Sequence, residues 1–341
     1  MGKSLPAREP SPAKKIFCSG VGKFLDGKYE EAEMDFQKVI HLDPSLPLAY
    51  CYLGIISLEM GNVSLGMQWC EQGLKIAPEN SYLHYCLGAA FERQGNLEEA
   101  MKQYTIYLKD HPHDAECLFS LGCVYDQAGS FQKAIRYYKE AFKYDSVHFK
   151  ASYNLALLLG EKGQLSQAVD YLKKTVEIHP SYWKGWIKLG LFYSFQKKWK
   201  EATSAYERAV ELRGDVSDSF YNLGLCYLTA GRPKKAVKVF KKALTLNPKD
   251  TESVFYLAIA YVDMKEDMQA IKVLHQALMI DLDHEKTHYL LGRLYYIHGE
   301  KEKGDKELEF LKGINSNFTL ALEDALSIAK KGQQFYVQKK V

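Results

Sequence analysis

The apolar and polar positions of this chain follow a helical spacing that repeats along its length. Between Phe220 and Asp250, apolar residues recur three and four positions apart in two short stretches separated at Gly231. This spacing predicts two consecutive helices. The same arrangement returns every 34 residues in both directions, without insertion or deletion. The sequence therefore predicts nine successive helix pairs and an all-α fold.

Each predicted pair carries two small residues, where its helices cross and leave no room for a larger side chain. The first helix contributes Gly20, Gly54, Gly88, Gly122, Ala156, Gly190, Gly224, Ala258 and Gly292. The second helix contributes Ala32, Gly66, Ala100, Ala134, Ala168, Ala202, Ala236, Ala270 and Gly304. Because a pair with one apolar face cannot bury that face alone, we expect the pairs to stack on one another.

Glycine marks the turn inside most pairs. It stands at Gly27, Gly61, Gly95, Gly129, Gly163, Gly231 and Gly299, in agreement with the preference for a left-handed residue just past a helix end. Lys197 and Lys265 occupy this column in the two remaining pairs. We therefore expect these two turns to be less tight.

The period and the positions of Leu223, Gly224, Ala236, Phe240 and Pro248 make the chain resemble the tetratricopeptide repeat family. The resemblance implies a right-handed superhelical solenoid of antiparallel helix pairs over residues 13–318. Apolar residues on one face of the following segment predict a C-terminal capping helix at 319–331. We expect residues 1–12 to form a disordered tail and residues 332–341 a frayed one.

Composition places the chain in a reducing compartment. The formal net charge of +3 is too small to imply a nucleic-acid partner, and none is expected. The seven cysteines include no Cys-x-x-Cys spacing, and several fall on apolar helix positions. No apolar run approaches the ~18 residues of a membrane span, and the N-terminus has no apolar core for secretion. The predicted location is the cytoplasm.

One catalytic motif occurs, the zinc-protease pattern His-Glu-x-x-His at His284 to His288. Its chemistry needs both histidines on one helix face as zinc ligands, with Glu285 polarising a water molecule. However, the period places His284 in a turn, and His288 in a column that Trp186 and Phe220 fill elsewhere. We therefore expect no enzyme activity, no catalytic or metal-binding residue and no cofactor.

The resemblance further implies that the first helix of each pair lines a concave groove that binds peptide segments. Two columns four residues apart face this groove, and the second is almost wholly apolar where the family often has asparagine. We weigh this against packing of the same side chains between repeats. The candidate peptide-binding residues are Tyr85, Phe119, Tyr153, Asn154, Leu157, Lys184, Ile187, Lys188, Leu191, Tyr221, Asn222, Leu225 and Phe255.

Some family members hold a peptide carboxylate with five polar residues over three repeats. Asn154, Lys184 and Lys188 match such positions, whereas Phe119 and Cys123 depart from them. Lysine also lacks the bidentate geometry of arginine. The match therefore predicts, at most, a looser site for acidic peptide groups.

Charge suggests a second surface. Residues 171–250 contain 16 lysines and arginines against 7 aspartates and glutamates. Five of the lysines lie on the second helix of the seventh repeat, on the expected convex side. We interpret these lysines either as a solvated helix face or as a site for an acidic partner, an anionic lipid or nucleic acid.

The sequence favours a non-enzymatic scaffold or adaptor that binds a protein or peptide, with a hydrophobic or acidic segment in the groove. Two alternatives remain. One is a cytoplasmic chaperone for a secreted or assembling client protein, and the other is a non-catalytic subunit of an enzyme complex. A homo-oligomer is compatible with the sequence, which does not distinguish the groove from the basic face of repeats six and seven as the main surface.

Overall fold

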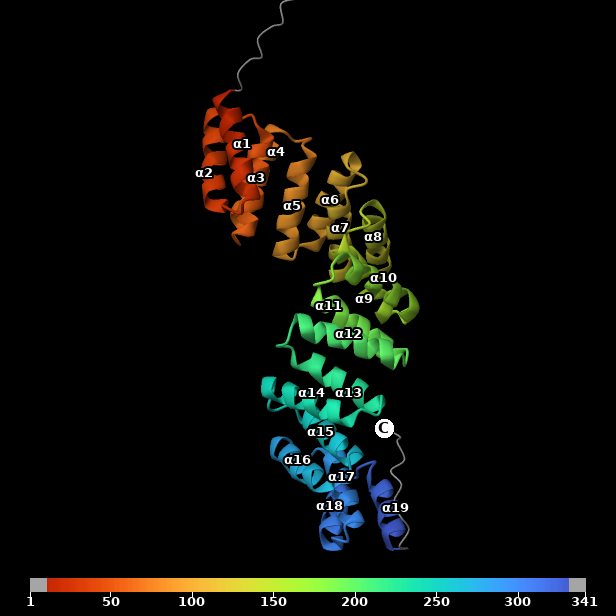
Figure 1. The fold of residues 1–341 in the computed structure, drawn as a ribbon. Helices are drawn as coiled ribbons and strands as arrows, with labels where there is room; N and C mark the ends of the chain where they lie inside the picture. The colour runs from red at the N-terminus through yellow and green to blue at the C-terminus, as the bar shows by residue number, and fades with distance from the viewer. Residues whose placement is uncertain (1–10, 331–341) are drawn as a thin grey trace, which may run out of the picture. The chain divides into compact units, whose positions relative to one another are not determined.

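The computed structural model describes residues 11–330. Within them the chain is helical throughout, with nineteen helices joined by short turns and no strand (Figure 1). The helices form two compact units, the first ending at Ile178 and the second beginning at His179.

The first unit contains five helix pairs. Its helices are α1 (Pro12–Leu25), α2 (Tyr29–Leu42), α3 (Pro47–Glu59), α4 (Val63–Ile76), α5 (Ser81–Gln94), α6 (Leu97–Asp110), α7 (Ala115–Gln127), α8 (Phe131–Tyr144), α9 (Phe149–Glu161) and α10 (Leu165–Ile178). Helix α1 begins one residue before the predicted boundary, because Ser11 caps it by accepting a hydrogen bond from the Lys14 N–H at 3.3 Å.

The second unit contains four helix pairs and a final helix. Its helices are α11 (Trp183–Phe195), α12 (Trp199–Leu212), α13 (Ser217–Thr229), α14 (Pro233–Leu246), α15 (Thr251–Asp263), α16 (Asp267–Ile280), α17 (Glu285–Ile297), α18 (Lys301–Gly313) and α19 (Thr319–Lys330). In both units the pairing and the boundaries of the helices follow the 34-residue period, as predicted.

A ring of the second helix fills the space beside the small residue of the first. A Cβ added to Gly224 would lie 2.5 Å from the Cε1 and Cζ atoms of Phe240, and one added to Gly122 would lie 2.7 Å from Cδ1 and Cε1 of Tyr138. Both rings are fully buried. Glycine is therefore required at these crossings for steric reasons.

At two crossings the facing residue of the second helix is leucine, and alanine occupies the column of the first helix. Ala156 and Ala258 stand sixteen residues before Leu172 and Leu274, at the spacing that separates each glycine from its ring. All four side chains are completely buried. The methyl group of alanine and the smaller leucine together fill the space that glycine and an aromatic ring fill elsewhere.

The two lysine turns differ from the prediction. Lys197 and Lys265 adopt φ values of 58° and 62°, in the left-handed region that the glycines of the other turns also occupy. The Lys197 N–H donates to the Ser194 carbonyl at 2.9 Å, the same distance as from the Gly231 N–H to the Leu228 carbonyl. The expectation of looser turns is wrong, because the turn hydrogen bonds impose this conformation on lysine despite its Cβ.

Helix α19 covers the end of the last helix pair, as predicted. Leu322 and Ala325 are buried against α17 and α18, and Leu322 is the side chain that a Cβ on Gly292 would meet, at 2.6 Å. An ion pair of 2.6 Å between Lys312 and Glu323 joins α18 to α19. Residues 1–10 of the tail predicted over 1–12, and the tail predicted over 332–341, lie outside the described residues. Ser11 and Pro12 instead cap and begin α1, so the prediction of a disordered tail is wrong for these two residues.

Candidate functional site

In each unit, some of the first helices of successive pairs lie against one another. Helix α3 contacts α5 and α5 contacts α7 in the first unit, while α11 contacts α13 and α13 contacts α15 in the second. Each second helix instead packs against the first helix of the following pair, as α4 does against α5 and α14 against α15. We call the exposed faces of the first helices of each unit the first-helix wall of that unit.

Tyr85 and Phe119 lie on the first-helix wall of the first unit and are half-buried. The Tyr85 ring packs against the rings of Tyr104 and Tyr107, with centroid distances of 5.7 and 5.1 Å. Burial raises the pKa of the Tyr85 hydroxyl well above its usual range. The Tyr85 ring thus contributes to packing within its own helix pair and also presents part of its surface.

Phe119 contacts a histidine that caps the next helix. The Phe119 and His148 ring centroids are 4.8 Å apart. His148 Nδ1 accepts a hydrogen bond from the Ala151 N–H at 3.1 Å, so its Nε2–H donates to Glu116 at 3.2 Å. That bond holds the pKa of the Glu116 carboxyl below its usual value, although partial burial opposes the shift.

Asn154, Leu157 and Tyr153 lie on α9, and all three are half-buried. The Asn154 side-chain amide donates to the Tyr138 hydroxyl at 3.4 Å and approaches Cys123 Sγ at 3.8 Å. Burial raises the pKa of the Cys123 thiol to about 11, so this residue is neutral near pH 7. The amide nitrogen is thereby oriented, and the amide oxygen has capacity to accept a hydrogen bond from a bound backbone.

Two carboxylates on this wall were missed by the sequence reasoning. Glu92 and Asp126 accept hydrogen bonds from the hydroxyls of Tyr104 at 2.7 Å and Tyr138 at 3.4 Å. Burial raises the pKa of each carboxyl, against the effect of the tyrosine hydrogen bond. Their signal in the sequence is an acidic residue at the same position of two successive repeats, twelve residues before the tyrosine that serves it.

In the second unit, the wall begins with basic and apolar residues of α11. Lys184 is exposed, whereas Ile187, Lys188 and Leu191 are half-buried. The Lys184 ammonium lies 5.7 Å from the centroid of the Trp183 ring. Asn154, the third residue of the proposed carboxylate site, belongs to the first unit.

Tyr221, Asn222 and Leu225 continue the wall on α13 and are half-buried. The Tyr221 ring lies 5.8 Å from that of Tyr256, and burial raises the pKa of its hydroxyl. Phe255, in contrast, is only 5% exposed.

Phe255 is covered by side chains of the following repeat. The His284 ring lies 5.6 Å from the Phe255 ring, and the Lys286 ammonium lies 6.0 Å from its centroid. A 2.9 Å ion pair with Glu252 holds Lys286 in place. Phe255 therefore belongs to the packing between repeats, and we leave it out of the proposed surface.

The side chains of the His-Glu-x-x-His motif are engaged in structural contacts. His284 precedes α17 and lies 2.7 Å from the Thr287 hydroxyl. His288 contacts the Glu307 carboxylate through Nδ1 at 2.5 Å and the Leu282 carbonyl through Nε2 at 2.8 Å. Glu285 accepts a hydrogen bond from the Ser316 hydroxyl at 2.5 Å. Among the described residues, no group of three or more His, Cys, Asp or Glu side chains is arranged to hold a metal ion.

The cysteines are mostly inside the fold. Cys18 is exposed and Cys123 half-buried, whereas the other five are buried. Cys51 and Cys86 bring their sulfur atoms to 2.7 Å in the core between α3 and α5. Across residues 11–330, none of the helices combines the length and apolar character needed to cross a membrane.

Helix pairs that recur every 34 residues and stack within each unit define a helical-repeat protein. Sequence models of the tetratricopeptide repeat match residues 81–145, 119–182, 184–215 and 217–250. The chain belongs to the tetratricopeptide repeat family.

Solved structures of this family resemble the chain in fold. The C-terminal part of a TPR repeat-containing protein from Cytophaga hutchinsonii has a TM-score of 0.57 and 18% identity, over 71% of this chain and 99% of that one. PilF of Pseudomonas aeruginosa has a TM-score of 0.50 and 20% identity, over 62% and 97%. YrrB, described as a TPR protein with an unusual peptide-binding site, has a TM-score of 0.48 and 22% identity, over 57% and 96%. Comparison with curated proteins gave no match.

Proposed function

We propose that this protein is a non-enzymatic cytoplasmic scaffold or adaptor that binds a segment of another protein on its first-helix wall. The observation that supports this function is the repetition of half-buried apolar side chains at equivalent positions of the first helices within each unit. In the second column, Leu157 on α9 carries it in the first unit, and Leu191 on α11 and Leu225 on α13 carry it in the second. A bound segment would remove the rest of their apolar surface from water.

Polar groups on the first-helix wall of each unit would orient a bound segment. The Asn154 amide is held by Tyr138, and Asn222 stands at the equivalent position of α13. Amide side chains can pair with both groups of an extended peptide backbone. When an extended peptide binds in this way, the apolar columns would provide the affinity, and the asparagine amides would set the direction of the peptide chain.

The test replaces the leucines of the wall with a charged residue. In the double variant Leu157→Asp and Leu191→Asp, partners recovered by affinity purification and identified by mass spectrometry should be lost. The matched control replaces two exposed apolar residues outside the wall, Met279→Asp and Leu282→Asp, which are 86% and 74% exposed. Both variants should keep the helical circular-dichroism signal of the natural protein.

Retention of every partner by a folded wall variant would refute the proposal. Loss of the same partners from both variants would also refute it, because the wall would then have no special role. Enzyme activity that co-purifies with a partner and disappears in the wall variant would identify that partner as the catalytic chain, with this protein as its scaffold.

A further inference from the structure

Helix α14 presents an exposed face that carries only positive charge. Its five lysines are exposed and the helix contains no acidic residue, while Ala236, Phe240 and Ala243 bury the opposite face. We call this surface the α14 lysine face; it consists of Lys234, Lys235, Lys238, Lys241 and Lys242. At 1.5 Å per residue, it extends over about 12 Å of the helix axis.

The lysines of this face make no ion pair with any residue between 11 and 330. Lys235 lies over the Tyr227 ring at 5.3 Å, and Lys241 over the Tyr261 ring at 5.6 Å. These contacts support the side-chain stems and leave the charges uncompensated by carboxylates. The face therefore retains its capacity to attract an anionic group.

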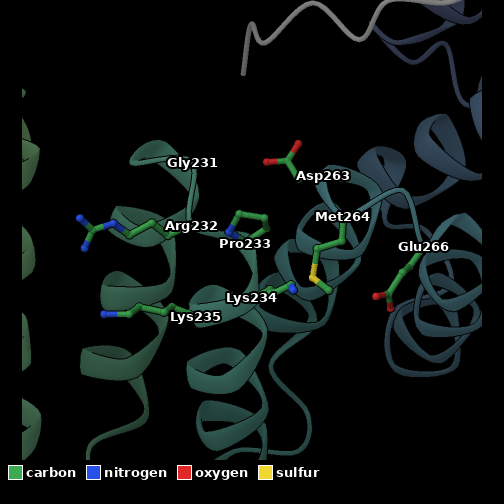
Figure 2. A pocket seen from close by; sticks show the side chains of 8 residues that line it. All are labelled: Gly231, Arg232, Pro233, Lys234, Lys235, Asp263, Met264 and Glu266. Carbon is green, nitrogen blue, oxygen red and sulfur yellow. The ribbon is translucent and has the colours of Figure 1, made fainter.

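A cleft of mixed charge adjoins the beginning of α14. It has a volume of about 590 Å³ and lies between the turn before α14 and the turn before α16. Figure 2 shows Lys234 of α14 extending toward Met264, with Asp263 and Glu266 on the same far side, whereas Arg232 and Lys235 extend away from these three residues. An occupant of this cleft thus meets a cation on one wall and carboxylates on the other.

We propose that the α14 lysine face and this cleft dock an acidic segment of a partner protein, in addition to the segment bound by the first-helix wall. The inference rests on the proposed scaffold function and extends it to a second surface. Carboxylates of the segment would pair with the lysines, while a basic or apolar residue of the same segment would enter the cleft near Met264 and Glu266. A protein segment fits this arrangement, because acidic, basic and apolar side chains can follow one another within a few residues.

The charge pattern disfavours a nucleic acid as the occupant. A polynucleotide is uniformly anionic, so Asp263 and Glu266 would repel it at the end of the lysine face. Its bases would also need exposed rings for stacking. The Tyr227 and Tyr261 rings beneath the lysines are only 6% and 9% exposed.

An anionic membrane fits less well for a different reason. Peripheral helices that bind lipid combine basic residues with apolar side chains that enter the bilayer. Among the described residues, none of the exposed large hydrophobic side chains lies between 196 and 267. The surface therefore provides charge without an apolar anchor.

The test uses the full chain and a fluorescent twelve-residue peptide with glutamates spaced three and four apart and a lysine at one end. The variant Lys238→Gln, Lys241→Gln, Lys242→Gln should weaken binding on the order of tenfold at low salt. The control Lys272→Gln, Lys301→Gln, Lys306→Gln removes the same charge from other exposed positions of the second unit and should bind normally. Increasing NaCl from about 50 to about 200 mM should weaken binding to the natural protein.

Two further probes separate the other occupants, a single-stranded DNA of twenty nucleotides and vesicles containing phosphatidylserine. Tighter binding of either probe than of the peptide, lost in the α14 variant, would overturn the choice of a protein segment. Equal binding of the peptide to the α14 and control variants would overturn the docking site itself. The Leu157→Asp, Leu191→Asp variant should bind the peptide normally, so failure of the first-helix wall and failure of this surface can be distinguished.

Discussion

The pairing of glycine with an aromatic ring at the helix crossing can be tested at Gly224. In Gly224→Ala, the new methyl carbon would start 2.5 Å from two carbons of the Phe240 ring. Ordinary contacts between carbon atoms are about 3.5–4.0 Å. The ring or the helix must therefore move by about 1 Å to accommodate a single methyl group.

The surroundings of Phe240 oppose this movement. The ring is completely buried and lies 6.2 Å from the Tyr221 ring and 6.3 Å from the Tyr256 ring, so it is enclosed by further aromatic groups. Overpacking of this kind costs about 1–3 kcal/mol, whereas alanine in place of glycine within a helix gains only about 0.5–1 kcal/mol. We expect a net loss of about 1–2 kcal/mol in the free energy of unfolding of the second unit.

Two further variants isolate the cause. Gly22→Ala lies in α1, where an added Cβ meets nothing within 4 Å, so it should stabilise its unit by up to about 1 kcal/mol. The double variant Gly224→Ala, Phe240→Leu recreates the residue types found at Ala156 and Leu172. It should be more stable than the sum of the two single changes predicts, because leucine frees the space that alanine needs.

Urea unfolding followed by tryptophan fluorescence suits this test, since Trp183, Trp186 and Trp199 all lie in the second unit. Circular dichroism gives an independent measure of helix loss. A Gly224→Ala variant as stable as the natural protein would refute the steric argument. Strict additivity of the Gly224 and Phe240 changes would refute the idea that the two positions share one space.

Three other predictions follow from particular contacts. Lys197→Gly should stabilise the turn before α12 by roughly 0.5–1 kcal/mol, because glycine adopts the left-handed conformation without strain; a lower urea midpoint would contradict this. Under native conditions, one thiol should react rapidly with Ellman's reagent, and Cys18→Ser should abolish that fast phase, because Cys18 is the one exposed cysteine among the described residues. Burial alone would lower the pKa of His288, but its hydrogen bond to Glu307 raises it above the ordinary value of 6.5. The protonated pair therefore stabilises the fold fully below pH 6.5, and this contribution is lost as pH rises through the raised pKa; Glu307→Gln should remove that pH dependence from urea midpoints.

The two lysine turns show where reasoning from residue type reached its limit. Lys197 and Lys265 interrupt a glycine column, and lysine disfavours the left-handed region, so a looser turn was a reasonable expectation. In the structure the hydrogen bonds that close each turn compensate for that local cost. The conformation of the turn depends on both the local preference of lysine and the hydrogen bonds that close the turn, and only the structure shows the hydrogen bonds.

Phe255 and the Glu92–Tyr104 contact show the same limit on the first-helix wall. The period assigns Phe255 and Phe119 to one column, yet His284 and Lys286 of the following repeat cover Phe255 and leave it buried. The role of Glu92 on the wall follows from its hydrogen bond with the Tyr104 hydroxyl, which the structure shows. Exposure of a side chain depends on its neighbours in the adjacent repeat, and these differ from pair to pair.

The sequence by itself determined the helix pairs, their register and the small residues at the crossings. It could do so because every repeat buries the same face against its neighbours, which constrains the same positions each time. The tertiary structure decided which side chains of each column remain exposed, which carboxylates find a tyrosine hydroxyl, and how the helices group into two units. Those properties depend on contacts between particular side chains, within a helix pair or between neighbouring pairs, at positions where the sequence varies from repeat to repeat.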